Sequence, residues 1–445
     1  MFTILDDHRC PDLNVKQQYY SIYEHRLQHF HHQLHKAAST WTLQTPSPKI
    51  IHRVLDVTSE PCIAIGTLYK DSPNRPNVLA QFELQSDIED DDDKDKDDLA
   101  TQTTDHPTTK PGSYACALED SSGSIPLKFA NQQLVHELVS GVPLAVLGSE
   151  SPSGDFFIVT DVVFSGPPPP LTLTPFPSLL SSSSIVFVSD LSLCDPDSSS
   201  FSTNLLADLL SGFLSLPGLS SSRIIFTGGV FHSSETSSAG SNFYASMKAG
   251  LFGSVVIDWL NHLLSSTDDV NFDIIPGSFD PCPTSLPQPP IFKCLLPENP
   301  RLNRCRNPYS LQFQDSNNES FIISGSSGQA VNDICKYSSL SQIEALEMTL
   351  KASHFAPTAP DTLDLVPCGA DPLIMKKCPR VLFSAGQNFA EKRVTNRVFF
   401  EKSCCEYETL LLNIPSFKAT GTFVVLDLST MTTKCIKISQ DVAHQ

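Results

Sequence analysis

An apolar strand that stops abruptly is the feature that most constrains the fold of this chain. Asp273 to Ile275 forms a short, largely apolar run, the turn-forming pair Pro276-Gly277 comes directly after it, and small or polar residues dominate up to Pro281. In open α/β sheets, ligands and metals bind beyond the carboxyl ends of the strands, where such turns lie. The segment therefore predicts the tip of a strand in an α/β domain.

Strands and helices alternate through the second half of the chain, which supports a layered α/β domain over residues 185–445. Apolar runs predict strands at 185–190, 223–229, 272–275, 321–324 and 381–384. Helical periodicity predicts helices at 204–214, 243–264 and 341–351. The last of these opens with Ser341 and Glu344, spaced as in a capping box. Phe252, Val255, Val256, Trp259, Leu260 and Leu263 are expected to form the buried face of the second helix.

The first half of the chain has a different pattern. Residues 1–44 are expected to form a helical segment, with an apolar stripe between 17 and 36. Short strand-like runs follow at 61–68, 113–120, 142–149 and 156–164, with a short helix at 131–139. Several short strands separated by turns favour a small barrel over 45–166, with the OB-fold as the candidate.

Two segments are expected to lie outside this regular structure. Residues 86–112 contain nine acidic residues between Asp87 and Asp98, so we expect a disordered insertion in the barrel. Residues 167–184 are rich in proline and serine and are expected to form a stiff linker between the two domains.

Composition narrows the possible functions. The net charge of -19 disfavours stand-alone nucleic-acid binding, because affinity for phosphates comes from lysine and arginine. The thirteen cysteines are irregularly spaced, which favours reduced thiols over a disulfide framework or a zinc ribbon. No signal peptide and no apolar run of about 18 residues is present, so we expect a soluble intracellular protein without a membrane span.

The successive strand tips resemble those of calcineurin-like metallophosphoesterases, in which acids and histidines hold two metals that activate water. Here the first tip keeps its aspartate but has serine for histidine, the second has Gly-Gly for Gly-Asp, the third has Ser-Phe for Asn-His, and the last has no histidine. We therefore predict a degenerate phosphoesterase-like domain with no catalytic residues, no metal and no cofactor. The vestigial positions are Asp190, Ser192, Gly228, Gly229, Ser278, Phe279, Asp280, Gln387 and Asn388.

A wider resemblance extends along most of the chain. The run from Gly325 to Ile334, followed by Tyr337-Ser338-Ser339, resembles the small, B-type subunit of eukaryotic DNA polymerase delta. Further colinear matches are 273–281, Leu286-Pro287-Gln288-Pro289, Asn307-Pro308-Tyr309, 354–363 and the N-terminal segment from Gln18 to Leu27. The acidic insertion and the serine-rich stretches depart from this pattern.

This resemblance implies an OB-fold joined to an inactive phosphoesterase-like domain. It also implies a nuclear, non-catalytic scaffold in DNA replication and repair. Expected partners are the cysteine-rich C-terminal domain of the catalytic subunit and a third accessory subunit, and through them the sliding clamp and DNA. The catalytic subunit of the translesion polymerase zeta is a further expected partner. The sequence does not single out the interface residues.

Two other functions stay open at this stage. One is a divergent metal-dependent phosphoesterase, which would need bound Mn, Fe or Zn. The other is a single-stranded nucleic-acid binder that uses the barrel, which requires a basic groove with stacking aromatic rings. The residues that could form such a groove are Tyr69, Phe82, Tyr114, Phe129, Lys70 and Lys128.

Overall fold

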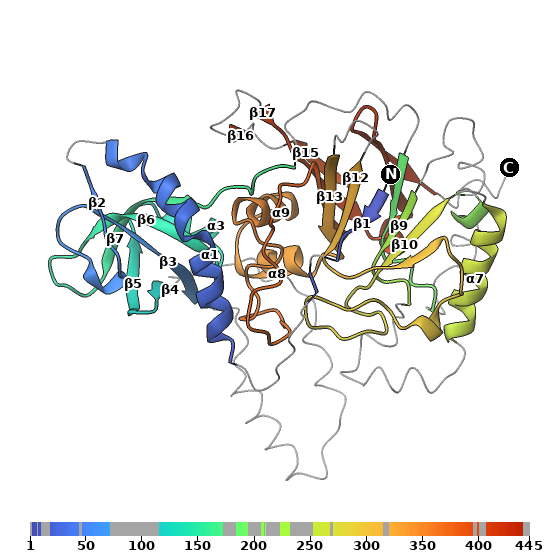
Figure 1. Ribbon diagram of the computed structural model, residues 1–445, viewed down its shortest axis with the longest axis horizontal. Coiled ribbons are helices and arrows are strands. Elements are labelled where there is room, and N and C mark those ends of the chain that lie inside the picture. The colour runs from blue at the N-terminus through green and yellow to red at the C-terminus, as the bar shows by residue number, and fades with distance from the viewer. Residues whose placement is uncertain are drawn as a thin grey trace, which may run out of the picture.

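The computed structural model consists of a β-barrel and a pair of six-stranded sheets, joined by a helical layer (Figure 1). It describes the chain apart from residues 1, 7, 10–17, 44–46, 72–114, 172–183, 195–205, 209, 211–222, 232–251, 268–269, 315–319, 395–397, 400–405 and 439–445. The predicted acidic insertion and most of the predicted linker therefore lie outside the described residues. None of the described helices has both the length and the apolar character needed to cross a bilayer.

The barrel lies at one end of the molecule and confirms the expected small all-β unit. Its strands are β2 (Lys49–Ile50), β3 (Cys62–Asp71), β4 (Ala115–Asp120), β5 (Gly123–Phe129), β6 (Pro143–Glu150) and β7 (Phe157–Phe164), and antiparallel pairing of β3 with β6 closes it. The short helix α3 (Gln132–Glu137) lies within the predicted 131–139, and the Asn131 side chain caps it by accepting a hydrogen bond from the Gln133 N–H at 3.0 Å.

One barrel strand differs from expectation. Residues 121–124 read as a turn in the sequence, whereas β5 already begins at Gly123. Ile125, Leu127 and Phe129 point into the barrel core, and the residues between them are exposed. This alternation at every second residue is the signal of a half-buried strand.

The other end of the molecule contains two sheets packed face to face. The first has the order β1 (Phe2–Ile4), β12 (Tyr309–Gln314), β13 (Ser320–Ser326), β14 (Val381–Gln387), β18 (Leu410–Pro415) and β15 (Glu391–Val394). The second has the order β11 (Leu302–Arg304), β10 (Asn271–Ile275), β9 (Arg223–Thr227), β8 (Ser184–Val188), β19 (Thr422–Asp427) and β20 (Thr432–Lys437). A small hairpin of β16 (Val398–Phe399) and β17 (Glu406–Tyr407) completes the strands.

Parallel strands form the centre of each sheet. Strands β8, β9, β10 and β11 are mutually parallel, as are β13, β14 and β18. Antiparallel strands lie at both edges of the first sheet and at the β20 edge of the second, whereas β11 is a parallel edge strand. Apolar side chains from both sheets meet between them, including Phe187, Ile225, Ile323 and Phe383. Because parallel strands end at the same edge, this arrangement brings the tips of β8, β9, β10 and β14 to one end of the double sheet.

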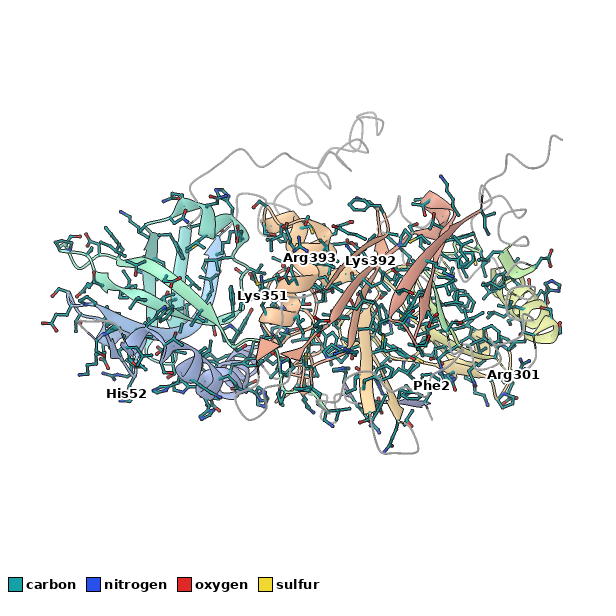
Figure 2. All side chains as sticks on the ribbon, turned by 90° about the horizontal axis from the view of Figure 1, so that it is seen from above. Phe2, His52, Arg301, Lys351, Lys392 and Arg393 are labelled. Carbon is teal, nitrogen blue, oxygen red and sulfur yellow. The ribbon has the colours of Figure 1, made fainter. Side chains whose placement is uncertain are left out.

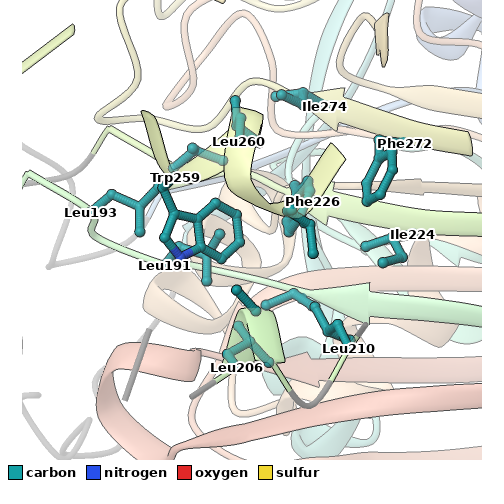
Figure 3. Close-up of a cluster of buried hydrophobic side chains, with 14 of the residues drawn as sticks. Leu191, Leu193, Leu206, Leu210, Ile224, Phe226, Trp259, Leu260, Phe272 and Ile274 are labelled. Carbon is teal, nitrogen blue, oxygen red and sulfur yellow. The ribbon is translucent and has the colours of Figure 1, made fainter. Parts of the chain in front are cut away.

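Helix α7 (Phe252–Ser266) covers the outer face of the second sheet (Figure 3). Trp259 and Leu260 pack there against Phe226 and Phe272. The predicted residues 243–251 of this helix lie outside the described residues. The prediction that Val255 is buried is wrong: its side chain is 47% exposed, because the helix turns residues 256, 259, 260 and 263 to the sheet and leaves 255 beside that face.

Helices α8 (Gln329–Tyr337) and α9 (Gln342–Lys351) cover the first sheet on its barrel side (Figure 1). The capping box is confirmed: the Glu344 carboxylate accepts hydrogen bonds from the Ser341 N–H at 3.0 Å and from the Ser341 hydroxyl at 2.7 Å. The short helix α10 (Phe417–Thr420) follows β18 and is the last of the described helices.

We expect Ser341→Ala to lower the free energy of unfolding by about 0.5–2 kcal/mol, because the N-terminal N–H groups of α9 lose their cap. Urea denaturation followed by circular dichroism measures this loss. Ser265→Ala is the matched control, because that hydroxyl only bonds the His262 carbonyl within α7. Equal stability of both variants would mean that the cap contributes nothing.

Helix α1 (Tyr20–Ala38) joins the two ends of the molecule. Phe30 and Leu34 pack on the barrel, while Ile22 belongs to the same cluster as α8 and α9. Between them lies Arg26, which is 0% exposed. Its guanidinium donates to Asp371 at 2.6 Å and to the carbonyls of Gly141, Pro357 and Ala359 at 2.8–2.9 Å.

Arg26 therefore connects helix α1 to two other parts of the chain. Gly141 lies in a barrel loop, whereas Pro357, Ala359 and Asp371 lie beyond α9. Gly141 has φ +80°, and a Cβ atom there would overlap the Pro357 oxygen. The contact between the barrel and the double sheet is thus as tight as packing inside a single core.

Candidate functional site at the strand tips

The structure brings most of the predicted tip residues together. Asp190 follows β8, Gly228 and Gly229 follow β9, and Asp280 lies in the loop after β10. The Asp190 N–H donates to the Gly228 carbonyl at 2.8 Å, and the Ser192 N–H donates to the Gly229 carbonyl at 2.8 Å. The Gly386 N–H, at the tip of β14, donates to the Ser189 hydroxyl at 2.8 Å.

Both carboxylate oxygens of Asp190 are engaged inside the protein. The Ser192 hydroxyl donates to one at 2.9 Å, and the Ser416 hydroxyl donates to the other at 2.7 Å. Asp190 and Ser192 have φ of +52° and +50°, so the backbone is held in the left-handed region that few non-glycine residues adopt. The first tip is a closed hydrogen-bonded turn in which the aspartate acts as an acceptor for serine hydroxyls.

The second tip leaves no room for a side chain. Gly229 has φ +70°, and a Cβ atom there would stand 2.7 Å from Asp190 Oδ1 and 2.8 Å from Asp190 Cα. Gly228 has φ +82° and would place a Cβ atom 2.8 Å from Ser327 Cβ. Glycine is therefore required twice at this turn, both for its conformation and for the close approach of the first tip.

Asp280 holds the second and third tips together. Its carboxylate accepts hydrogen bonds from the N–H groups of Gly229 and Gly277 at 2.8 Å and of Phe231 at 2.9 Å. Burial raises the pKa of Asp280, and the three N–H groups act against that shift. The side chain thus satisfies backbone donors of two loops that regular sheet pairing leaves open.

We expect Asp280→Asn to lower the free energy of unfolding by about 1–3 kcal/mol, because an amide nitrogen would face backbone donors. Chemical denaturation of the full chain measures it. Asp155→Asn, an exposed change in the barrel, is the control. A loss no larger than that of the control would show that the carboxylate does not hold the tips together.

The remaining predicted positions do not converge on this centre. Ser278 is exposed, and Phe279 is 50% exposed. Gln387 is buried, and its amide donates to the Ser384 hydroxyl at 3.0 Å and to the Ala385 carbonyl at 2.7 Å. Asn388 is exposed. Across the described ranges, no three histidine, cysteine, aspartate or glutamate side chains gather in a way that could hold a metal ion.

A buried amide cluster beside the tips escaped the sequence reasoning. The Asn307 side-chain nitrogen lies within hydrogen-bond distance of three acceptors, the Gln288 side-chain oxygen at 2.8 Å, the Ser327 hydroxyl at 2.7 Å and the Gln329 side-chain oxygen at 3.0 Å. The Ser327 hydroxyl donates in turn to the Pro276 carbonyl at 2.7 Å. The Gln329 amide donates to Gln288 at 2.9 Å. These residues lie in the short motifs at 286–289, 307–309 and 325–334. Polar side chains next to prolines and glycines in these motifs were the sequence signal that could have indicated a buried polar cluster.

The cations proposed for a nucleic-acid groove are used elsewhere. Lys70 is 4% exposed, donates to the carbonyls of Leu138 at 2.9 Å and Tyr337 at 3.1 Å, and has its pKa lowered to about 8 by burial. Lys128 lies over the ring of Phe156 at 3.7 Å, and Phe129 is in the barrel core. Phe82 and Tyr114 lie outside the described residues. Among the exposed cations labelled in Figure 2, Lys351 and Arg393 both pair with Glu347.

The sequence matches two known families along its length. Residues 18–162 match the DNA polymerase delta subunit OB-fold domain, which confirms the OB-fold expected for the barrel. Residues 185–391 match the family of B-type subunits of DNA polymerases alpha and epsilon. Together these matches cover the barrel and the greater part of the double sheet.

Full-length relatives agree with these matches. The DNA polymerase delta small subunit of Arabidopsis thaliana is 30% identical, with 96% of this chain and 92% of the relative aligned. The small subunit of Oryza sativa subsp. japonica is 29% identical over 95% of this chain and 93% of the relative. DNA polymerase delta subunit 2 of Drosophila melanogaster is 29% identical over 96% of this chain and 95% of the relative. The chain therefore belongs to the family of DNA polymerase delta small subunits, which are non-catalytic accessory subunits in DNA replication.

Proposed function

We propose that this protein is a rigid scaffold that bridges the cysteine-rich C-terminal domain of the polymerase delta catalytic subunit to a further accessory subunit. The observation that carries the proposal is the closure of the strand tips. Both oxygens of Asp190 and the carboxylate of Asp280 are taken up by hydrogen bonds within the protein. A site arranged in this way fixes the geometry of the loops and offers no open position for a reacting water.

We further propose that the double sheet is a degenerate phosphoesterase-like domain. Two packed sheets with central parallel strands, helices outside them and loops gathered at one end support this relationship. Asp190, Ser192, Gly228, Gly229, Ser278, Phe279, Asp280, Gln387 and Asn388 are then the positions at which a metal site was lost.

The joint between the barrel and the double sheet supports the scaffold role. Arg26 and Lys70 each bond groups on more than one part of the chain, and both are buried. A partner that contacts both parts meets surfaces whose relative position is already fixed, so binding costs little conformational entropy. Half-exposed Phe279 and Phe389 beside the tips add apolar contact area of the kind that protein interfaces use.

The proposed cellular role follows from the family. The protein would act in the nucleus in replication and repair, and it would reach the sliding clamp and DNA through its partners. The catalytic subunit of polymerase zeta is a further proposed partner. Direct contact with DNA is not part of the proposal, because Lys70 is buried and bonded to backbone carbonyls and Lys128 lies over the ring of Phe156.

Co-expression of the full chain with the C-terminal domain of the polymerase delta catalytic subunit tests the proposal. The expected result is a stoichiometric complex that survives gel filtration, while this chain purified alone contains less than about 0.1 equivalent of Mn, Fe or Zn. A chain that fails to bind the domain and carries about two metal ions, as a dinuclear phosphoesterase would, would contradict it.

A further inference from the structure

A pocket of about 360 Å³ opens at the joint between α1 and the barrel. Tyr20, Tyr23 and Glu24 of α1 line one side, and Tyr69 of β3 and Glu119 of β4 line another. Asp361, from the segment beyond α9, also contributes. The volume falls at the lower end of the range for ligand pockets. The pocket exists only when helix, barrel and double sheet are assembled, because each part supplies some of its wall.

The walls combine aromatic rings with negative charge. Three tyrosines face the pocket, and Tyr20 is 59% exposed. Four carboxylate residues line it, Glu24, Glu119, Asp120 and Asp361, and no lysine or arginine is among its lining residues. Asp120 is held by the Val54 N–H at 2.8 Å and the Ser122 N–H at 2.7 Å, so Glu24 and Glu119, both exposed, are the acids best placed to meet a ligand.

We propose that this pocket receives an arginine side chain from a protein partner. The inference rests on the scaffold function proposed above and specifies one contact of that scaffold. Carboxylates favour a cation and repel phosphate, which excludes a nucleic-acid backbone as the occupant. A guanidinium also stacks on tyrosine rings and bonds a carboxylate through two N–H groups. A metal ion would need several converging ligands, and across the part of the chain that the structure describes no three acidic, histidine or cysteine side chains gather to supply them.

The joint already holds one guanidinium in this manner. Arg26 lies over the ring of Tyr23 at 5.4 Å while its nitrogens donate to Asp371 and to backbone carbonyls. The pocket offers the same two kinds of group, a tyrosine ring and a carboxylate, nearer to the surface. Tyr20 is the more exposed ring, and Glu24 lies one helical turn further along α1. A partner residue that enters here would contact the helix and the barrel at once.

A direct test uses the full chain and two small probes, N-acetyl-arginine methylamide and its neutral isostere N-acetyl-citrulline methylamide. Ligand-observed NMR titration should show saturable binding of the arginine probe and at least about tenfold weaker binding of the citrulline probe, because only the first carries charge. The double substitution Glu24→Lys with Glu119→Lys should remove the difference between the probes.

The control is Glu60→Lys with Asp155→Lys, which makes the same charge change on exposed residues of the same barrel. This variant should bind the arginine probe as the wild type does. Absent or non-saturable binding to the wild type, equal affinity for both probes, or equal loss in the control variant would each overturn the inference. None of these results bears on the co-expression experiment, so failure of the pocket and failure of the scaffold function are distinguishable.

Discussion

Replacement of Arg26 by methionine is expected to lower the free energy of unfolding by about 3–5 kcal/mol, the cost of removing one partner from a buried ion pair. Methionine fills a similar space but leaves Asp371 without its guanidinium. The Asp371 carboxylate is 0% exposed, and its remaining side-chain partner is His354 at 2.9 Å. The carbonyls of Gly141, Pro357 and Ala359 lose a donor as well.

The two tryptophans of the chain allow this effect to be located. Trp41 packs on the barrel and Trp259 packs on the second sheet, so Trp41→Phe and Trp259→Phe each leave a reporter in one part. The urea transitions followed by the fluorescence of the two tryptophans should coincide in the wild-type background. They should separate when Arg26→Met is added, because without the Arg26 contacts the barrel and the double sheet can unfold independently. Arg53→Met is the control, because the Arg53–Asp56 pair is exposed and solvent screening leaves such surface pairs with little effect on stability. Coincident transitions and a loss below about 1 kcal/mol would show that Arg26 does not join the parts.

The loss should also depend on pH. Burial alone would raise the pKa of Asp371, but Arg26 and then His354 outweigh burial and hold that pKa well below its usual range. A carboxyl group of this kind stabilises the fold above its unfolded pKa of about 4, and the contribution disappears as the pH falls. The difference between wild type and Arg26→Met should therefore be largest near neutral pH and shrink below about pH 4.

Restoring an aspartate at position 229 should damage the protein instead of recreating a metal site. Gly229→Asp is expected to lower the free energy of unfolding by about 2–4 kcal/mol, from a non-glycine residue at positive φ and from overpacking. The new Cβ atom would meet Asp190 at 2.7–2.8 Å, so the first tip must move. A second carboxylate next to Asp190 adds like-charge repulsion.

Two alanine variants separate these causes. Gly229→Ala and Gly166→Ala change residues with similar φ, +70° and +77°, but nothing lies within 4 Å of a Cβ atom at position 166. Gly166→Ala should lower the free energy of unfolding by about 1–2 kcal/mol. Gly229→Ala should lower it further, because its new Cβ atom also overlaps Asp190. Metal analysis of purified Gly229→Asp after incubation with Mn²⁺ should show no stoichiometric ion. A stable Gly229→Asp protein that binds metal would mean that the site is only one residue short of function.

Local patterns predicted the buried parallel strands at the centre of the second sheet, four of the barrel strands and helices α1, α3, α7 and α9, but not the edge strands or helix α8. The capping box at Ser341, the buried runs of β8, β9 and β10, and the Pro-Gly turn after Ile275 each depend on neighbours in sequence, and the structure confirms them. Strand β5 was not predicted, because the serines at 121–124 resemble a turn, although Ile125, Leu127 and Phe129 alternate as in a half-buried strand. The exact boundaries at 44, 166 and 184 stay predictions.

Contacts between distant residues could not be read from the sequence. The sequence marks Asp190 and Gly229 as candidate positions, but only the folded chain shows that Asp190 is held by Ser416 and blocks a side chain at 229. The partners of Arg26 lie more than 100 residues away, and an arginine on a helix usually faces solvent. Strand β1 was also not predicted from the sequence. Its three residues are too few to show a periodic pattern, and its partner β12 is distant in sequence.

The pairing of β1 with β12 sets an order of events during synthesis. Phe2 pairs with Phe313, so at about 5–20 residues per second the ribosome needs roughly 15–60 s to deliver the partner strand. The barrel strands end at Phe164, which lets the barrel close much earlier. The Arg26–Asp371 ion pair forms later still, because Asp371 must first emerge from the ribosome tunnel. The nascent chain thus carries a finished barrel with an unpaired leading strand for about a third of its synthesis, and the surfaces that combine both halves arise only in the last part of translation.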